Sequence, residues 1–168
     1  MNPKRQIDWL AGRVAAIDAA RRHLWAQGVG ELYPIEVQIR NDSAGRPIVS
    51  THPELHLSIS HSAGSAVAVV SATQPVGVDL EPVAERSEEL IKAAFTEEDL
   101  AQLPANADRG EWLTRLWCAK EARAKQTGAG IAQPKSLKIT AVEAETVFVD
   151  DAPVQTILHD GWIIATTS

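Results

Sequence analysis

The first helical pattern in the sequence covers residues 7–27. Apolar side chains recur there mostly at intervals of three and four residues, which is the spacing of one helix face: Leu10, Val14, Ile17, Ala20, Leu24 and Trp25. Two glycines end this pattern. Further on, residues 35–40 alternate between apolar and polar, residues 41–45 are turn formers, and residues 47–49 are largely apolar. This succession predicts a short β-hairpin.

The middle of the chain predicts three more strands. Residues 55–59 alternate, and residues 66–70 form a continuous apolar run, which is typical of a strand covered on both faces. Gln74 and Pro75 break that run. Residues 76–80 then begin another strand.

The second part of the chain begins with helices. Residues 87–95 predict a helix with Ser87 as its N-cap, and Thr96 starts a second, short one. A loop over residues 104–110 leads into a long helix over residues 111–126, which a glycine-rich segment ends. Four short strands follow, over residues 137–141, 146–149, 156–159 and 162–166.

The order of these elements is mixed rather than strictly alternating, which predicts an α+β fold with a largely antiparallel sheet. Each part of the chain carries a helix followed by about three strands, and Gln74-Pro75 lies between the parts. We therefore expect one domain over residues 1–168, made of two similar halves with a cleft between them. The halves would cover about residues 1–74 and 75–168.

The composition fits a folded domain of a reducing compartment. A chain of 168 residues with 45% hydrophobic residues is long and apolar enough to bury a core. A single cysteine, Cys118, excludes an internal disulfide and a cysteine metal cluster. The formal charge of -6 argues against general nucleic-acid binding, and no apolar run approaches the ~20 residues that span a bilayer. We expect a soluble cytoplasmic protein, or a domain of one.

Two stretches carry charges where a core should be. Asp79 and Glu81 interrupt an apolar run, and their spacing of two places both side chains on one face of a strand. Glu121 and Lys125 lie four apart in the long helix, in line with Trp117. A divalent cation held by the three carboxylates would compensate these charges, and oxygen ligands favour magnesium. The alternatives are a solvated strand edge and an exposed ion pair worth only ~0.3–0.5 kcal/mol.

Basic side chains and hydroxyls suggest an anion site in the first half. His61 follows a predicted strand and lies between two serines, Ser60 and Ser62. Hydroxyls, an imidazole and open backbone N–H groups at a strand end suit phosphate oxygens. Arg46 in the predicted turn and Arg13 in the first helix are further candidates, although a surface role explains each of these residues by itself.

Taken together, these stretches resemble the 4′-phosphopantetheinyl transferases, in particular the longer type that activates surfactin and enterobactin synthetases. The Gly-Val-Asp-Leu-Glu stretch is weak by itself, but with Trp-x-x-Lys-Glu-Ala-x-x-Lys about forty residues later it is a specific combination. The matching pieces occur in the family's order and span most of the chain: Leu10 to Ala16, Gly45 to Pro47, Ile59 to Ser62, Gly77 to Glu81, and Trp117 to Ala122 with Lys125.

The resemblance implies a reaction. Such enzymes move the 4′-phosphopantetheine arm of coenzyme A to a serine of an acyl or peptidyl carrier protein and release adenosine 3′,5′-bisphosphate. It implies that Asp79, Glu81 and Glu121 hold Mg²⁺, with Mn²⁺ as an alternative, and that Glu121 is the base. Lys125 would offset charge on the departing phosphate or protonate it.

The resemblance also implies where coenzyme A binds. His61, which is counted among the catalytic residues as well, would hold a phosphate together with Ser60, and Arg13 and Arg46 would contact the nucleotide's phosphates beside Lys125. Coenzyme A would lie in the cleft of a pseudo-dimer made of two similar α/β halves, and the protein would act as a monomer. Because such domains also end large polyketide and fatty-acid synthases, we expect either a domain of this kind or a short free-standing enzyme.

Two other functions account for part of the pattern. A module that binds coenzyme A or a carrier protein with little catalysis would keep the same motifs. An unrelated magnesium-dependent phosphohydrolase would explain the acids but not the ordered motifs. Modification of a carrier protein distinguishes both from a transferase.

Overall fold

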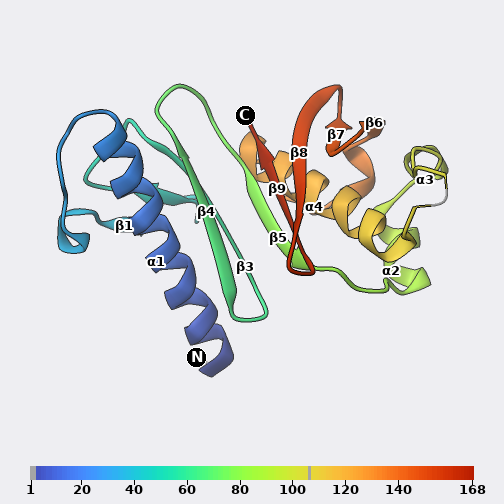
Figure 1. Ribbon diagram of the computed structural model, residues 1–168, viewed down its shortest axis with the longest axis horizontal. Coiled ribbons are helices and arrows are strands. Elements are labelled where there is room, and N and C mark those ends of the chain that lie inside the picture. Colours follow the sequence, from blue (N-terminus) through green and yellow to red (C-terminus); the bar gives the residue numbers. More distant parts are fainter. Residues whose placement is uncertain (1–2, 106) are drawn as a thin grey trace.

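The computed structural model describes residues 3–105 and 107–168. The first part of the chain forms a long helix that lies across a β-hairpin (Figure 1). Its elements are α1 (Pro3–Ala26), the 3₁₀ turn η1 (Pro34–Glu36), β1 (Ile39–Asn41), β2 (Pro47–Val49), β3 (His56–Ser62) and β4 (Ser65–Ser71). The strands β1 and β2 pair antiparallel, as do β3 and β4.

A stripe of buried residues, three of them small, lets α1 lie close to this hairpin. The stripe recurs every four residues, and its members are Gly12, Ala16, Ala20 and Leu24. A Cβ at Gly12 would lie 3.2 Å from the Ile59 Cγ2 atom on β3. The helix begins four residues before the predicted start.

The predicted apolar face of α1 is only partly correct. Ala20 and Leu24 are buried and Ile17 is half-buried, whereas Leu10, Val14 and Trp25 are exposed. The small residues allow the close approach to the hairpin, so they form the buried face instead of the larger apolar residues beside them.

The second part of the chain is a five-stranded antiparallel sheet with one face covered by a helix (Figure 1). The strand order in the sheet is β5-β9-β8-β7-β6. Its elements are β5 (Val78–Pro82), α2 (Glu88–Ala94), α3 (Glu97–Leu100), α4 (Arg109–Thr127), the 3₁₀ turn η2 (Pro134–Ser136), β6 (Ile139–Glu143), β7 (Thr146–Val149), β8 (Ala152–His159) and β9 (Trp162–Thr167). The prediction of an α+β fold with a largely antiparallel sheet is confirmed.

Local sequence signals determine where the helices of this part begin and end. The Ser87 hydroxyl accepts the Leu90 N–H at the start of α2, and Thr96 and Asp99 form a capping box around α3. The carboxylate of Asp108 accepts the Glu111 N–H at 2.7 Å and starts α4, which ends at Gly128 in the left-handed conformation. These three helices therefore follow the sequence-based expectation closely.

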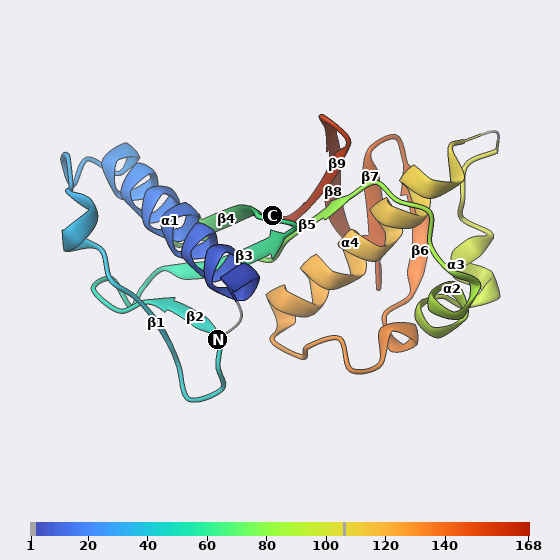
Figure 2. The same ribbon diagram turned by 90° about the horizontal axis from the view of Figure 1, so that it is seen from below.

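The order of elements repeats along the chain. A long helix, a 3₁₀ turn and two successive antiparallel hairpins appear as α1-η1-β1-β2-β3-β4 and again as α4-η2-β6-β7-β8-β9. In Figures 1 and 2 the two helix-and-hairpin units lie on opposite sides of the molecule, and β5 lies between β3 of the first unit and β9 of the second. The repeated order supports the expected two halves, whose structural equivalence stays a prediction.

Some predicted strands were misplaced. Residues 35 and 36 belong to a 3₁₀ turn instead of a strand, because Pro34 starts the turn and the Glu36 carboxylate accepts the Tyr33 N–H at 2.7 Å. The strand after His56 extends through His61 to Ser62, so His61 does not follow a strand end. Strand β4 is half-buried along its whole length and is not covered on both faces as its apolar run suggested.

Among the residues that the structure describes, no helix combines the length and the apolar character needed to cross a membrane.

Candidate active site

The candidate site lies where β3 of the first part meets β5 of the second (Figure 2). Three serines of β3, spaced by two residues, point at β5. The Ser58 hydroxyl accepts the Val78 N–H at 3.0 Å, Ser60 donates to Asp79 Oδ1 at 2.8 Å, and Ser62 donates to Glu81 Oε2 at 3.0 Å. Because the two strands belong to different sheets, side-chain hydroxyls make these contacts in place of a backbone ladder.

Asp79 is the most deeply buried acid of the site, with 4% of its surface exposed. Its Oδ1 atom accepts two hydrogen bonds, from Ser60 and from Lys125 Nζ at 2.8 Å. Its Oδ2 atom is buried and has no hydrogen-bond partner within the described part of the chain. A buried carboxylate with one open oxygen is costly unless a ligand completes it. The interpretation of Asp79 as part of a solvated strand edge is therefore wrong.

Helix α4 carries Glu121 and Lys125. Gly77, just before β5, determines how closely this strand approaches the helix. A Cβ at Gly77 would lie 1.8 Å from the Ala122 carbonyl oxygen, so only glycine lets the strand start this close to the helix. Lys125 crosses this gap and donates to Asp79 and to the Val78 carbonyl oxygen at 3.0 Å. It pairs with Asp79 instead of forming the exposed helix pair with Glu121 that the spacing allowed.

Glu121 is half-buried on the side of α4 that faces β5. Burial, followed by the negative charges of Asp79 and Glu81, raises the pKa of Glu121 to about 6, against the opposing effect of Lys125. Burial and the charge of Asp79 also raise the pKa of the Cys118 thiol, one turn earlier on the same helix. The negative charges of Asp79 and Glu81 therefore act on Glu121, as expected for acids that share a cation site.

In the described part of the chain, the three acids do not surround a single metal position. The described residues contain no group of three or more His, Cys, Asp or Glu side chains placed to ligate one ion. The donor set nevertheless fits a hard divalent cation, because all three candidates are carboxylates and Asp79 keeps an unpartnered oxygen. The assignment of Asp79, Glu81 and Glu121 as metal ligands stays a prediction.

Arg13 and His61 come together in one pocket, as the sequence suggested. The pocket has a volume of about 200 Å³ and lies between α1, β1 and β3. Arg13 stacks at 5.2 Å on the ring of Trp9 and donates to the Asn41 side chain, and its Nη1 atom is buried with no partner among the described residues. Burial lowers the pKa of this guanidinium, as expected for a cation without an acidic partner. The pocket suits an anion.

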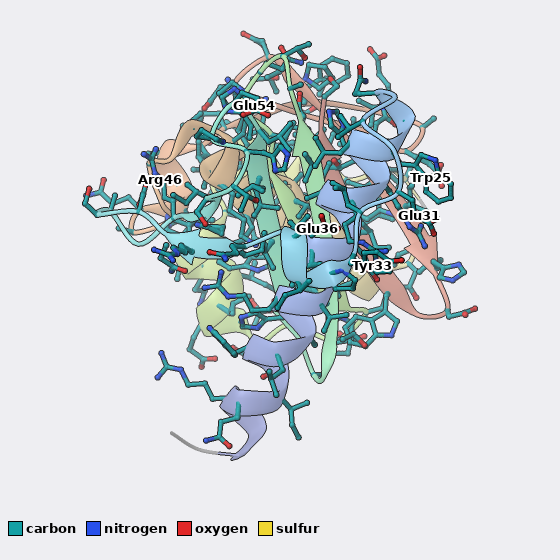
Figure 3. The ribbon with its side chains drawn as sticks, turned by 90° about the vertical axis from the view of Figure 1, so that its left-hand side faces the viewer. Trp25, Glu31, Tyr33, Glu36, Arg46 and Glu54 are labelled. Atoms are coloured by element: carbon teal, nitrogen blue, oxygen red, sulfur yellow. The ribbon has the colours of Figure 1, made fainter. Side chains whose placement is uncertain are left out.

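Arg46 lies in a second, adjoining pocket that reaches the end of α4. This pocket of about 350 Å³ also contains Lys125 and shares Pro47 and Ile59 with the first pocket. The Arg46 side chain is 64% exposed and is held by Asp42, which also accepts the Arg46 backbone N–H. Figure 3 shows Arg46 near the β1–β2 turn at the edge of the molecule, away from Tyr33 and Trp25. Arg13 and Arg46 therefore contact different parts of one continuous region.

The structure assigns contacts to other residues of the motifs. Lys120, next to Glu121 on α4, donates to Asp99 Oδ2 at 2.7 Å, and both side chains are buried. Ser60, expected at a phosphate, donates to Asp79 instead. The role of Ser62 was missed, although the alternation of serines along β3 was visible in the sequence.

Comparisons with known proteins bear on the family of this chain. A family model described as the 4′-phosphopantetheinyl transferase superfamily matches residues 75–164, which is more than half of the chain. The 4′-phosphopantetheinyl transferase Sfp of Bacillus subtilis is 30% identical over 101 residues, 59% of this chain and 45% of Sfp. The 4′-phosphopantetheinyl transferase HetI of Nostoc is 30% identical over 133 residues, 75% of this chain and 56% of HetI.

A shorter protein also matches. The holo-[acyl-carrier-protein] synthase of Bacillus cytotoxicus is 40% identical over 75 residues, 43% of this chain and 62% of the synthase. The chain spans about half the length of the longer curated relatives that it matches. The region matched by the family model contains Asp79, Glu81, Glu121 and Lys125. The chain belongs to the 4′-phosphopantetheinyl transferase superfamily.

Proposed function

We propose that this protein transfers the 4′-phosphopantetheine group of coenzyme A to a serine of an acyl or peptidyl carrier protein, with adenosine 3′,5′-bisphosphate as the second product. The observation that carries the proposal is the buried Oδ2 atom of Asp79, which has no hydrogen-bond partner among the described residues and lies beside Lys125 and two further carboxylates. An open acid cluster next to a cation suits a magnesium-dependent reaction at a diphosphate.

The proposed residues divide the reaction between them. The carrier serine oxygen bonds to the β-phosphorus of coenzyme A while the bond from that phosphorus to the bridging oxygen breaks. Glu121 accepts the serine proton, and Lys125 offsets the charge of the departing phosphate or returns a proton to it. Asp79, Glu81 and Glu121 would hold Mg²⁺ or Mn²⁺, which supplies Lewis-acid stabilisation of the diphosphate charge when bound.

The two adjoining pockets support a route for coenzyme A. His61 and Arg13 line one pocket within the first half, and Arg46 and Lys125 line the other, which residues of both halves form. The two pockets share Pro47 and Ile59, so the four basic side chains lie along a continuous region. In this proposal the diphosphate lies at Lys125, and the remaining phosphate of the nucleotide lies nearer Arg13 and His61. Two equivalent halves within one chain, packed as a pseudo-dimer, would let the protein act as a monomer.

The direct test is carrier modification read by intact mass. The protein is incubated with coenzyme A, Mg²⁺ and a panel of apo carriers from peptide, polyketide and fatty-acid systems, so the preferred carrier is found in the same experiment. We expect a mass gain of one phosphopantetheine group, which stops when EDTA is added. Asp79→Ala should abolish the gain, whereas Glu143→Ala, an exposed acid at the end of β6, should keep it.

Other results would favour the other functions. Binding of coenzyme A without any carrier mass gain would favour a binding module. Release of inorganic phosphate without carrier modification would favour a phosphohydrolase. Full turnover in Asp79→Ala would contradict the assignment of the metal ligands.

A further inference from the structure

Three side-chain contacts join β3 to β5. Ser58, Ser60 and Ser62 meet Val78, Asp79 and Glu81, so both chain segments run in the same direction along this contact. Figures 1 and 2 both show β3 beside β5 at the middle of the molecule. The alternate residues Leu57, Ile59 and His61 lie on the opposite face of β3, as the two-residue period of a strand requires.

Two of these three contacts end on candidate metal ligands. An ionised carboxylate only accepts hydrogen bonds, so Ser60 and Ser62 must donate their single hydroxyl protons to Asp79 and Glu81. The proton of Ser60 is then no longer available to a phosphate oxygen. Ser58 differs, because its hydroxyl accepts a backbone N–H and touches neither carboxylate in the contacts that the structure describes.

Each serine contact leaves the other carboxylate oxygen open. Ser60 and Lys125 occupy Asp79 Oδ1 and leave Oδ2 without a partner among the described residues. Ser62 contacts the Oε2 atom of Glu81 and not its Oε1 atom. A hydrogen bond to one oxygen fixes the rotation of a carboxyl group, and outer groups that orient a ligand typically change metal affinity 10- to 100-fold when removed.

We propose that Ser60 and Ser62 are positioning residues, which reach across from the first half to orient the Asp79 and Glu81 carboxylates for the divalent cation. This inference rests on the proposed function, because it assumes that these acids bind the cation. It makes the cation site a joint product of both halves, although all three ligands belong to the second. It also replaces the expected phosphate contact of Ser60.

The test measures cation affinity without catalysis. Mn²⁺ binding to the whole protein is followed by electron paramagnetic resonance, in the absence of coenzyme A and carrier. We expect Ser60→Ala and Ser62→Ala each to raise the Mn²⁺ dissociation constant roughly tenfold or more. Ser60→Thr and Ser62→Thr keep a hydroxyl and should restore most of the affinity.

Ser58→Ala is the matched control, because it removes a hydroxyl from the same face of the same strand. It should lower thermal stability, since the buried Val78 N–H loses its acceptor, and leave the Mn²⁺ dissociation constant unchanged. Coenzyme A binding, measured separately by calorimetry in EDTA, should be unchanged in Ser60→Ala.

The outcomes separate this inference from the proposed function. Unchanged Mn²⁺ affinity in Ser60→Ala and Ser62→Ala, with wild-type protein binding Mn²⁺, would overturn the inference alone. Weaker coenzyme A binding in EDTA with unchanged Mn²⁺ affinity would return Ser60 to the phosphate site. Wild-type protein that binds no Mn²⁺ would overturn both the inference and the metal-dependent function.

Discussion

Two buried aspartates in this protein differ in how completely they are paired. Both oxygens of Asp99 are used, since Lys120 and the Thr96 N–H donate to Oδ2 and the Ile139 N–H donates to Oδ1. Asp79 keeps one oxygen without a partner among the described residues. A fully satisfied acid ties elements together, whereas an acid with an open oxygen is ready for a ligand. Asp99 therefore forms a structural ion pair with Lys120, whereas Asp79 is a candidate for binding a ligand at the site.

Lys120 should be essential to folding and not to the chemistry. Burial opposes the ionised form of Asp99, but Lys120 and the two backbone N–H groups outweigh it and hold the pKa of this carboxyl below its ordinary value. Lys120→Met leaves that charge buried without its partner, so we expect the free energy of unfolding to fall by ~3–5 kcal/mol. Urea unfolding measures this. The double variant Lys120→Met with Asp99→Asn removes the buried charge and keeps a side-chain acceptor for the backbone N–H groups, so it should recover part of the loss. Equal losses in the single and the double variant would contradict the ion-pair explanation.

Glu121→Gln should stabilise the fold while removing the proposed base. The pKa of Glu121 is raised from 4.5 to about 6 in the folded protein, so between those values the folded state binds more protons than the unfolded state. Folding stability contributed by Glu121 is therefore lost as the pH rises through this window. The shift corresponds to ~2 kcal/mol, and we expect ~1 kcal/mol because the side chain is partly in water.

The measurement is urea unfolding in EDTA at pH 4 and pH 8. Glu121→Gln should exceed wild type by ~1 kcal/mol at pH 8 and match it at pH 4. Glu111→Gln on the same helix is not a suitable control, because Glu111 pairs with Arg115. The exposed Glu143→Gln is suitable and should show no such difference. A Glu121→Gln variant less stable than wild type at pH 8 would contradict the described environment.

At the scale of elements, the close contact of β5 with α4 is what brings strand acids and helix residues together. Gly77→Ala would place a Cβ 1.8 Å from the Ala122 carbonyl oxygen, a backbone atom that cannot turn aside. We expect the free energy of unfolding to fall by at least ~3 kcal/mol, measured by urea unfolding, since the strand and helix must separate.

Gly110→Ala provides the control for this prediction. Gly110 lies in α4 itself, and a Cβ there meets its nearest neighbour, Asp108 Oδ1, at an ordinary 3.4 Å. It should be close to neutral, because Gly110 lies in the first turn of α4 and alanine is at least as favourable as glycine within a helix. If the two alanine variants lost equal stability, the close approach at Gly77 would not be the cause.

Most elements can be predicted from sequence signals within a few residues of their ends. Contacts between distant residues cannot be predicted in this way. The caps at Ser87 and Thr96 and the end of α4 were read from neighbouring side chains. The sequence predicts shorter strands for the β3–β4 hairpin than the structure has. Its two-residue turn has Ala63, at φ 46, ahead of Gly64, and asparagine or aspartate is the usual turn signal at the position of Ala63.

The same limit applies to the candidate site. Residue spacing identified Asp79, Glu81, Glu121 and Lys125 as unusual, but it could not show that Lys125 reaches Asp79 across 46 residues. The serine contacts were likewise hidden, because their partners lie 19 residues further along the chain in a separate sheet. A sequence pattern locates side chains on an element, and packing between elements decides which of them meet.

At the scale of the whole molecule, the proposed ligands bind across both halves, so binding should stabilise the protein as a unit. Each ligand that binds only the folded state adds RT ln(1 + [L]/Kd), about 2.7 kcal/mol at one hundred times its dissociation constant. For a chain of this size we expect the midpoint of thermal unfolding to rise by roughly 5 to 10 °C for each ligand at that concentration, and by roughly 10 to 20 °C with Mn²⁺ and coenzyme A together. Differential scanning calorimetry measures the shift.

Two variants should distinguish the thermal stabilisation by Mn²⁺ from that by coenzyme A. Asp79→Asn removes a charge from the acid cluster and should lose the Mn²⁺-dependent part of the rise while keeping much of the part due to coenzyme A. Arg13→Ala, in the pocket with His61, should lose part of the coenzyme A contribution and keep that of Mn²⁺. If both variants responded to both ligands as wild type does, the cation and the nucleotide would bind elsewhere. Independent loss of each part would instead place the cation at the acids of the second half and the nucleotide phosphate at the pocket of the first.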